Sequence, residues 1–312
     1  MGEESGDESV VRLELLGPPR ARAAGTLWPL GGSDKLHLLL FYLAVEGETS
    51  RERLLDLFWP DHAATAARSN LRQVLHKLRH QLGEVIPLTV GRQTVALAPD
   101  VTVDVHDFLR LNESTERGDL TEAAALYRGP FLDDCLPPLG LDALEEWTLE
   151  WRDHLQALAV DLFRRALALA EAADERGEWQ QLAERLLELE PWEEEAHAAL
   201  MRRHAADGDT AAVEAQYRRL ADVLAEELGT EPGPDLQALR DQLTRGEAPP
   251  PPPPPGRPES RRLTALYVDC AAEDAEEALA VSASARTEIQ RRVEEWGGCV
   301  SDFYGSGVLA WF

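Results

Sequence analysis

The sequence predicts a mainly helical protein, with a small α+β region before the helices and a partial α/β segment after them. Three observations support this fold class. Residues 10–103 mix short alternating strand patterns with three helical patterns, and residues 104–246 are almost wholly helical in their periodicity. Seven consecutive prolines stand within residues 247–260, and strand and helix patterns return in residues 261–312. A length of 312 residues suggests about two domains, at ~150 residues each.

The first region opens with strands. Residues 10–17 alternate between apolar and polar side chains and end at two prolines, which is typical of a strand. A second short strand is expected near residues 26–30. Ser33 or Asp34 then supplies a side-chain cap for a helix whose leucines fall within residues 36–43.

Two further helices and a hairpin follow. Thr49 or Ser50 caps a helix over residues 51–59, and a third helix runs over residues 64–82 to a glycine. Residues 86–97 then read as two strands around the turn Val90-Gly91-Arg92-Gln93. Strands, three helices and a hairpin in this order predict a winged helix-turn-helix over residues 10–103.

The third helix has one apolar and one polar face. A helical turn of 3.6 residues places its apolar residues in one stripe: Ala67, Leu71, Val74, Leu75, Leu78 and Leu82. Arginine, lysine and glutamine on the opposite face are the side chains that bond guanine and adenine in the major groove. We expect DNA contacts from Arg68, Ser69, Asn70, Arg72, Gln73, His76, Lys77, Arg79 and His80, and from Arg92 in the hairpin. A solvated amphipathic helix is the alternative reading.

Charge is distributed unevenly along the chain. The net charge is −26, but residues 1–100 hold 11 basic and 13 acidic residues, a net of −2. The remaining 20 basic and 44 acidic residues give −24 for residues 101–312. Residues 62–93 hold five basic residues and one acid. Because salt screens charges beyond about 10 Å, a DNA partner meets this local basic stripe rather than the net charge.

The chain from residue 10 to residue 246 resembles the Streptomyces antibiotic regulatory protein (SARP) family, which joins an OmpR-type winged helix to a bacterial transcriptional activator domain. The strings that carry the resemblance are Leu15-Leu16-Gly17-Pro18, Ser50-Arg51-Glu52-Arg53-Leu54, Ala67-Arg68-Ser69-Asn70-Leu71-Arg72, Leu78-Arg79, Tyr127-Arg128-Gly129-Pro130-Phe131-Leu132, Ala196-His197-Ala198-Ala199-Leu200-Met201 and Glu226-Glu227-Leu228-Gly229-Thr230-Glu231-Pro232-Gly233. The resemblance implies major-groove reading by the third helix, a wing in the neighbouring minor groove, a homodimer on direct repeats and contact with RNA polymerase holoenzyme.

Residues 104–246 also predict a tetratricopeptide-like array from their own pattern. Helix starts at Gly118, Gly177 and Gly208 lead into Ala- or Leu-rich helices, and the last two lie 31 residues apart, near the ~34-residue repeat. Stacked helix pairs offer concave surfaces to protein partners. We interpret Trp147, Trp151, Trp179 and Trp192 as packing anchors rather than a ligand cage. The acidic runs 145–146 and 193–195 are interpreted as solvated faces.

Residues 261–312 resemble the opening of a class III nucleotidyl cyclase domain: a strand over 262–270, a helix over about 274–296 and a strand pair. Asp269 matches the first metal-binding aspartate of that family, and Ser306 stands where the second is expected. A hydroxyl is a poor replacement for a carboxylate ligand of a hard cation. We therefore expect a degenerate, truncated module with a vestigial Asp269 and no bound metal.

Several functional classes are disfavoured. The acidic start, residues 1–9, is expected to be disordered and lacks the features of a secretory signal, and no run approaches the ~18 apolar residues of a membrane span, which predicts a cytoplasmic location. Three distant cysteines and no phosphate-binding glycine motif favour a non-enzyme without cofactors. Two alternatives stay open: a nucleotide-sensing or cyclase-related signalling protein, and a pure protein-interaction scaffold.

Overall fold

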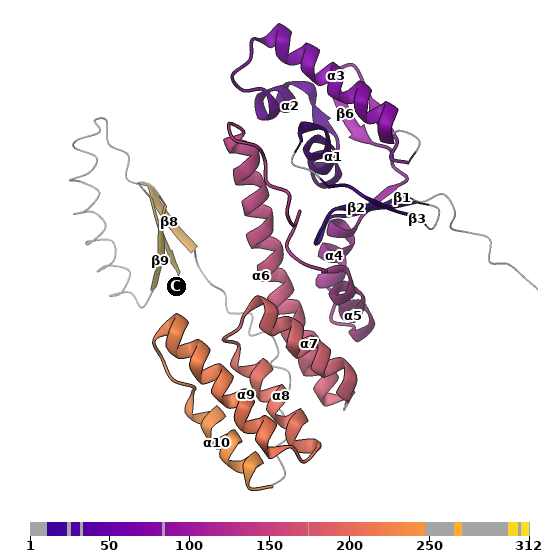
Figure 1. The fold of residues 1–312 in the computed structure, drawn as a ribbon. Coiled ribbons are helices and arrows are strands. Elements are labelled where there is room, and N and C mark those ends of the chain that lie inside the picture. Colours follow the sequence, from indigo (N-terminus) through magenta and orange to yellow (C-terminus); the bar gives the residue numbers. More distant parts are fainter. Residues whose placement is uncertain are drawn as a thin grey trace, which may run out of the picture. The chain divides into compact units, whose positions relative to one another are not determined.

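The computed structural model describes residues 11–23, 26–31, 34–82, 85–173, 175–246, 265–269, 299–304 and 307–311. The chain divides into two compact units, Met1–Pro255 and Gly256–Phe312, which are described separately (Figure 1). The predicted acidic tail and proline-rich linker lie outside the described residues. Among the helices that the structure describes, none combines the length and apolar character needed to cross a bilayer.

The N-terminal part of the first unit forms the expected winged helix. Its elements are β1 (Val11–Glu14), β2 (Arg20–Ala23), β3 (Thr26–Pro29), α1 (Lys35–Glu46), β4 (Thr49–Ser50), α2 (Arg51–Phe58), α3 (Ala64–Leu82), β5 (Leu88–Val90), β6 (Thr94–Leu97) and β7 (Val101–Val103). One sheet has the order β3-β2-β1-β7 and the other β4-β6-β5. The sequence pattern missed β2, β4 and β7, which are four, two and three residues long.

Side-chain caps set the starts of α1 and α2. The Asp34 carboxylate accepts a hydrogen bond from the backbone N–H of His37 at 2.9 Å, and the Ser50 hydroxyl accepts one from Arg53 at 3.1 Å. Each bond satisfies one of the N–H groups that have no partner within their helix. Of the two caps proposed for each helix, the later one in sequence is used. Helix α2 ends where Trp59 precedes Pro60, one residue earlier than predicted.

The helical part follows as α4 (Asp104–Asn112), α5 (Arg117–Leu126), α6 (Asp142–Ala172), α7 (Arg176–Leu189), α8 (Glu194–Ala206), α9 (Thr210–Val223), the π-helical turn η1 (Leu224–Leu228) and α10 (Pro234–Thr244). From α4 to α9, successive helices pack on one another, and α10 packs on both α8 and α9 (Figure 1). This stack of neighbouring helices confirms the predicted all-helical region.

The two parts of the first unit share one hydrophobic core, whose buried residues run from Val11 in β1 to Leu200 in α8. Strand β7 pairs in parallel with β1. Beyond β1, the segment 127–133 adds further backbone bonds: Leu132 N–H donates to Leu15 at 2.9 Å, and Gly17 N–H donates to Pro130 at 3.0 Å. The predicted boundary at residue 103 therefore falls inside a continuous core.

A second set of contacts joins α1 to α6. The indole N–H groups of Trp147 and Trp151 donate to one carboxylate oxygen of Glu46 at 2.7 and 3.1 Å. The rings of Tyr42 and Trp147 lie 5.0 Å apart between centroids. Phe131 contacts both tryptophans. Trp147 and Trp151 are thus packing anchors, as predicted.

Two of the predictions for aromatic and acidic residues need correction. Trp192 is 38% exposed and is not an anchor, whereas Trp179 is buried. The run 193–195 is not simply a solvated face: Glu193 pairs with Arg164, and the Glu194 carboxylate accepts from the Gly233 N–H at 3.0 Å. These acids tie α8 to α6 and to the turn before α10.

A buried histidine makes the stability of the helical part depend on pH. The His197 ring donates from Nε2 to the Pro191 carbonyl at 3.0 Å and accepts at Nδ1 from the Gln216 amide at 2.8 Å. Burial lowers its pKa below the ordinary value, since the charged ring loses its hydration. The neutral ring is therefore the folded form.

We expect the free energy of unfolding to fall as the pH drops below about 6.5, where the unfolded histidine takes up its proton. The stability that the neutral His197 ring contributes is fully present above that pH. Below it, the free energy of unfolding falls by at most ~1.4 kcal/mol per pH unit for this one proton. Urea unfolding at pH 7.5 and 5.5 measures it. Gln216→Glu supplies an acceptor for a protonated ring and should shrink the difference between the two pH values. An equal difference in both proteins would contradict this role.

The second unit contains β8 (Ala265–Asp269), β9 (Cys299–Tyr304) and β10 (Gly307–Trp311). The strands form an antiparallel sheet of order β8-β10-β9, in which Gly307 is opposite Asp269. The three expected strands are present. The expected helix over 274–296 and Ser306 lie outside the described residues, so the cyclase resemblance stays a prediction.

Candidate nucleic-acid interface

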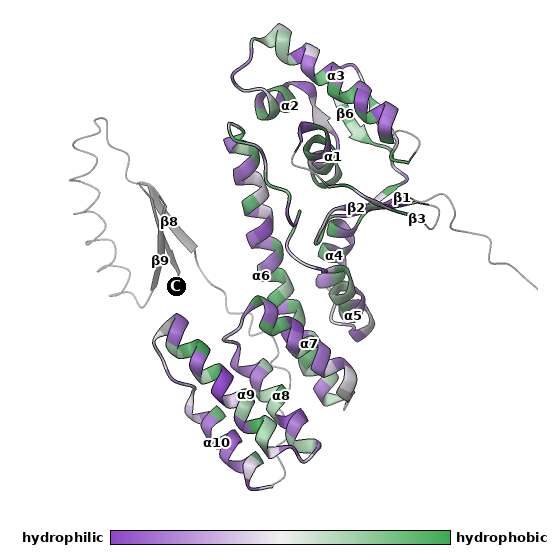
Figure 2. Cartoon of the chain, viewed as in Figure 1, coloured by the Kyte–Doolittle hydropathy of each residue, from purple (hydrophilic) through white to green (hydrophobic). Residues whose placement is uncertain are grey.

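Helix α3 separates its two faces as predicted. Ala67, Leu71, Leu75 and Leu78 are buried, and Val74 and Leu82 are half-buried. They face α1 and α2, which pack on α3. Hydrophilic residues alternate with hydrophobic ones along this helix (Figure 2). The remaining face is open to solvent.

That open face holds almost every residue predicted to contact DNA. The exposed ones on α3 are Arg68, Ser69, Arg72, Gln73, His76, Lys77, Arg79 and His80. Asn70 is half-buried. The rings of His76 and His80, one turn apart, lie parallel to within 23° with centroids 6.4 Å apart. The α3 face is therefore a contiguous polar strip.

The wing is the hairpin of β5 and β6. Its turn is closed by a hydrogen bond from the Gly91 N–H to the Thr94 carbonyl at 2.9 Å, and Arg92 is exposed at the tip. Two residues of β4 pair with β6, which holds the wing against the start of α2. The wing is thus attached to the same helix, α2, that packs on α3.

The cations of this surface have no acidic partners among the residues that the structure describes. Within the described residues, no ion pair or side-chain hydrogen bond is made by Arg68, Arg72, Lys77, Arg79 or Arg92. Elsewhere many arginines are paired; Arg20 and Arg22, for example, both bind the Glu14 carboxylate. In a chain of net charge −26, unpaired cations gathered on one face are free to meet an external anion.

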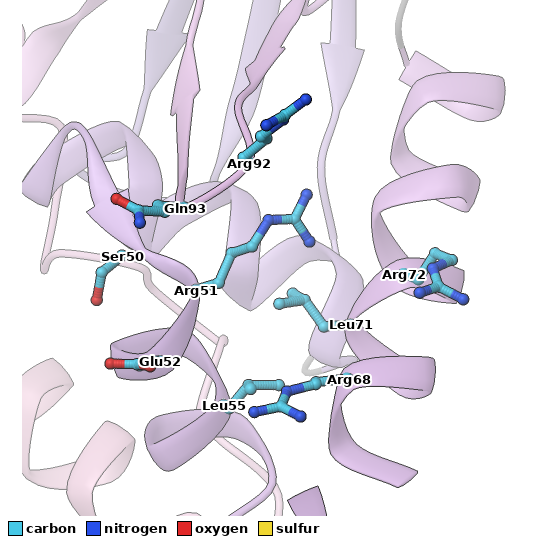
Figure 3. Close-up of a pocket in the computed structure, with 9 residues that line it drawn as sticks. All are labelled: Ser50, Arg51, Glu52, Leu55, Arg68, Leu71, Arg72, Arg92 and Gln93. Atoms are coloured by element: carbon cyan, nitrogen blue, oxygen red, sulfur yellow. The ribbon is translucent and has the colours of Figure 1, made fainter. Parts of the chain in front are cut away.

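A pocket of about 470 Å³ lies between the wing, α2 and α3 (Figure 3). Four arginines line it: Arg51, Arg68, Arg72 and Arg92. Ser50, Glu52, Leu55, Leu71 and Gln93 complete the lining. Arg51 and Arg68 extend into the space between α2 and α3. The arrangement suits a phosphate oxygen, which arginine binds through two parallel N–H groups.

The sequence pattern places Arg51 in the first turn of α2, but Arg51 is not among the residues predicted to contact DNA. Its guanidinium binds the backbone of the wing turn, 40 residues away. No local pattern signals such a contact.

Asp269 ends β8, and among the described residues no group of three or more His, Cys, Asp or Glu is placed to hold a metal ion.

Comparison with known proteins identifies the helical part. Residues 103–244 match the family described as "Bacterial transcriptional activator domain". The match covers 142 of the 312 residues, and this segment resembles an activator domain. It begins at the last residue of β7, so it follows the winged helix directly. The match confirms the resemblance to the SARP family that the sequence strings indicate.

The relatives are regulatory proteins. The chain is 26% identical over 257 residues to the regulatory protein AfsR of Streptomyces griseus, covering 76% of this chain and 25% of AfsR. It is 25% identical over 260 residues to the transcriptional regulatory protein MoaR1 of Mycobacterium tuberculosis, covering 75% of this chain and 79% of MoaR1. The chain thus spans about a quarter of AfsR.

A solved structure shows the same fold. Mycobacterium tuberculosis EmbR, in complex with a low-affinity phosphopeptide, superposes with a TM-score of 0.52 and 20% sequence identity, over 91% of this chain and 72% of that one. The likeness supports a winged helix followed by helical layers.

Proposed function

We propose that this protein is a sequence-specific DNA-binding transcriptional regulator of the activator type. Helix α3 enters the major groove, and the wing contacts the neighbouring minor groove and its phosphates. The observation that carries the proposal is the set of cations on α3 and the wing that have no acidic partner within the described part of the chain. These two elements are joined directly to the segment that matches an activator domain. The regulatory relatives support the same function.

The side chains divide by their chemistry. Arg72, Gln73 and Lys77 lie on the exposed face of α3 and carry the groups that bond base edges. Arg68 and Arg92 line the pocket, where a backbone phosphate fits. Phosphate contacts fix the register of the protein on DNA, and base contacts supply the sequence preference.

The activator domain is proposed to contact RNA polymerase holoenzyme through its helical layers, since stacked helix pairs provide broad surfaces for protein partners. Two copies bind direct repeats as a homodimer. We place this activity in the cytoplasm, and the proposal assigns no catalytic step to the chain.

Salt dependence tests the assignment of the face. Arg72→Ala and Lys77→Ala should each weaken binding to DNA, because each removes a contact to a base edge. Arg68→Ala should also reduce the slope of log affinity against log salt by about one, because its cation neutralises one phosphate. Fluorescence anisotropy with a labelled duplex measures both. Arg218→Ala on α9 is the matched control, because Arg218 is an exposed arginine far along the chain from this face. Variants of α3 that bind like the control would show that this face does not bind DNA.

A further inference from the structure

The turn of the wing, residues 90–93, is held by Arg51 at the start of α2. The Arg51 guanidinium donates from Nε and Nη2 to the Gly91 carbonyl at 3.3 and 3.2 Å. The Arg51 backbone N–H donates to the Gln93 carbonyl at 2.8 Å. One residue therefore binds the turn through both its backbone and its side chain.

Backbone pairing alone does not reach the tip. Strand β4 pairs with β6 only at Thr49 with Val95 and at Ser50 with Thr94, and the Arg51 N–H extends this ladder by one residue. In the part of the chain that the structure describes, no other hydrogen bond from outside the hairpin reaches Gly91 or Arg92. The Arg51 side chain is thus the contact that restrains the tip relative to α2.

We propose that Arg51 is a positioning residue that sets where Arg92 stands relative to the exposed face of α3. The inference rests on the proposed function, in which both elements contact one DNA duplex. A guanidinium that directs two N–H groups at one carbonyl fixes the direction of that carbonyl better than a single donor does. Because the spacing of the grooves is set by DNA, a wing held in place loses less conformational entropy on binding than a mobile one.

The competing explanation is that Arg51 is one more cation for the phosphates. It lines the pocket with Arg68 and Arg72, so its charge alone contributes to DNA affinity (Figure 3). The variant Arg51→Lys distinguishes the two roles, because it keeps the positive charge and loses the pair of N–H groups that bind the Gly91 carbonyl. The two roles also separate in the free protein, where no phosphate is present.

Hydrogen exchange in the free full-length chain is the first test. The Gly91 amide donates to Thr94 inside the turn. Arg51→Ala and Arg51→Lys should speed its exchange by about fivefold or more while the midpoint of thermal unfolding stays unchanged, because only the local opening of the turn becomes easier. Arg53→Ala is the control, since Arg53 is an exposed arginine of α2 whose backbone N–H, rather than its side chain, makes the cap contact with Ser50. Unchanged exchange at Gly91 in both Arg51 variants overturns the proposal.

DNA binding is the second test, with a duplex selected from G+C-rich genomic DNA as the probe. Arg51→Ala and Arg92→Ala should each weaken DNA binding by about tenfold. The double variant should also lose about tenfold rather than a hundredfold, because the two substitutions remove the same contact between the wing and DNA. With Arg51→Lys bound, the DNA should lose protection from hydroxyl radicals at the flank under the wing and keep its protection under α3. With Arg53→Ala bound, the DNA should stay protected at both places.

Additive losses, with the wing flank still protected in Arg51→Lys, would show that Arg51 is a simple cation. If the wild-type chain binds no duplex, the proposed function fails, and the exchange of the Gly91 amide still decides the role of Arg51. The two failures are therefore distinguishable.

Discussion

A chain that ends at Val103 is expected to unfold without a cooperative transition, whereas residues 1–246 keep one. The shorter chain has the complete winged-helix sequence but lacks the part of the core that the activator domain supplies. Phe108 and Phe131 are fully buried in that shared core, and Trp147 packs on Tyr42 of α1. Each large apolar side chain contributes about 1.5–3 kcal/mol by burial.

The shorter chain also lacks hydrogen-bond partners for part of its backbone. Leu15, Leu16 and Gly17 bond to the segment 127–133, and the N–H groups of Leu15 and Leu16 also donate to Asp104. Buried groups without partners cost about 1–3 kcal/mol each. Against a total stability of about 5–15 kcal/mol for a domain, costs of this size are decisive.

Thermal and urea unfolding followed by circular dichroism measure the outcome. Residues 1–246 serve as the control, because that chain removes only the linker and the second unit. A sharp transition in residues 1–103, with a midpoint close to that of the control, would mean that the winged helix is independent of the activator domain.

Asp104→Ala should be the most damaging single substitution, with a loss of about 3–5 kcal/mol in the free energy of unfolding. Its carboxylate accepts from the Leu15 N–H at 2.8 and 2.9 Å and from the Leu16 N–H at 3.0 Å. Arg128 stands 3.6 Å from the same carboxylate. Removing the acid leaves two buried N–H groups without their acceptor. It also takes from the half-buried Arg128 one of its two acidic neighbours, the other being Glu14.

Burial raises the pKa of Asp104, while the two N–H donors and Arg128 oppose that change. Both carboxylate oxygens act as acceptors in the structure, which is the geometry of the ionised form. Asp104→Asn keeps one acceptor and should lose less than the alanine variant.

Asp107→Ala is the matched control on the same helix. Asp107 binds Arg12 at 2.9 Å at the surface, and such exposed pairs contribute about 0–1 kcal/mol. Urea unfolding of the three variants gives the comparison. Equal small losses for Asp104→Ala and Asp107→Ala would contradict the role assigned to Asp104.

Local signals in the sequence predicted the elements that local physics determines. The bounds of α3, Ala64–Leu82, follow from its apolar period and the glycine after it. Its exposed face follows from the same period. The caps of α1 and α2 follow from Asp34 and Ser50, whose bonds span three residues.

Contacts between distant residues were not predictable in this way. Strand β7 exists because it pairs with β1, about 90 residues earlier, and its three residues carry no pattern of their own. Glu193 and Glu194 read as solvated acids because their partners, Arg164 and Gly233, lie 29 and 39 residues away. The roles of Arg51 and Asp104 were missed for the same reason. The boundary at residue 103 stays a prediction, and the core shared across it is the reason to expect that the winged helix is not stable alone.

Helix α3 and the wing are proposed to read a DNA sequence together. The most direct measurement selects bound fragments from G+C-rich genomic DNA with the full chain, and then titrates the selected and a random duplex with salt. We expect a short repeated site bound about 10³-fold or more tightly than random DNA, with an affinity for both that falls steeply as salt increases. No enriched site, and no salt-dependent affinity for any duplex, would contradict it.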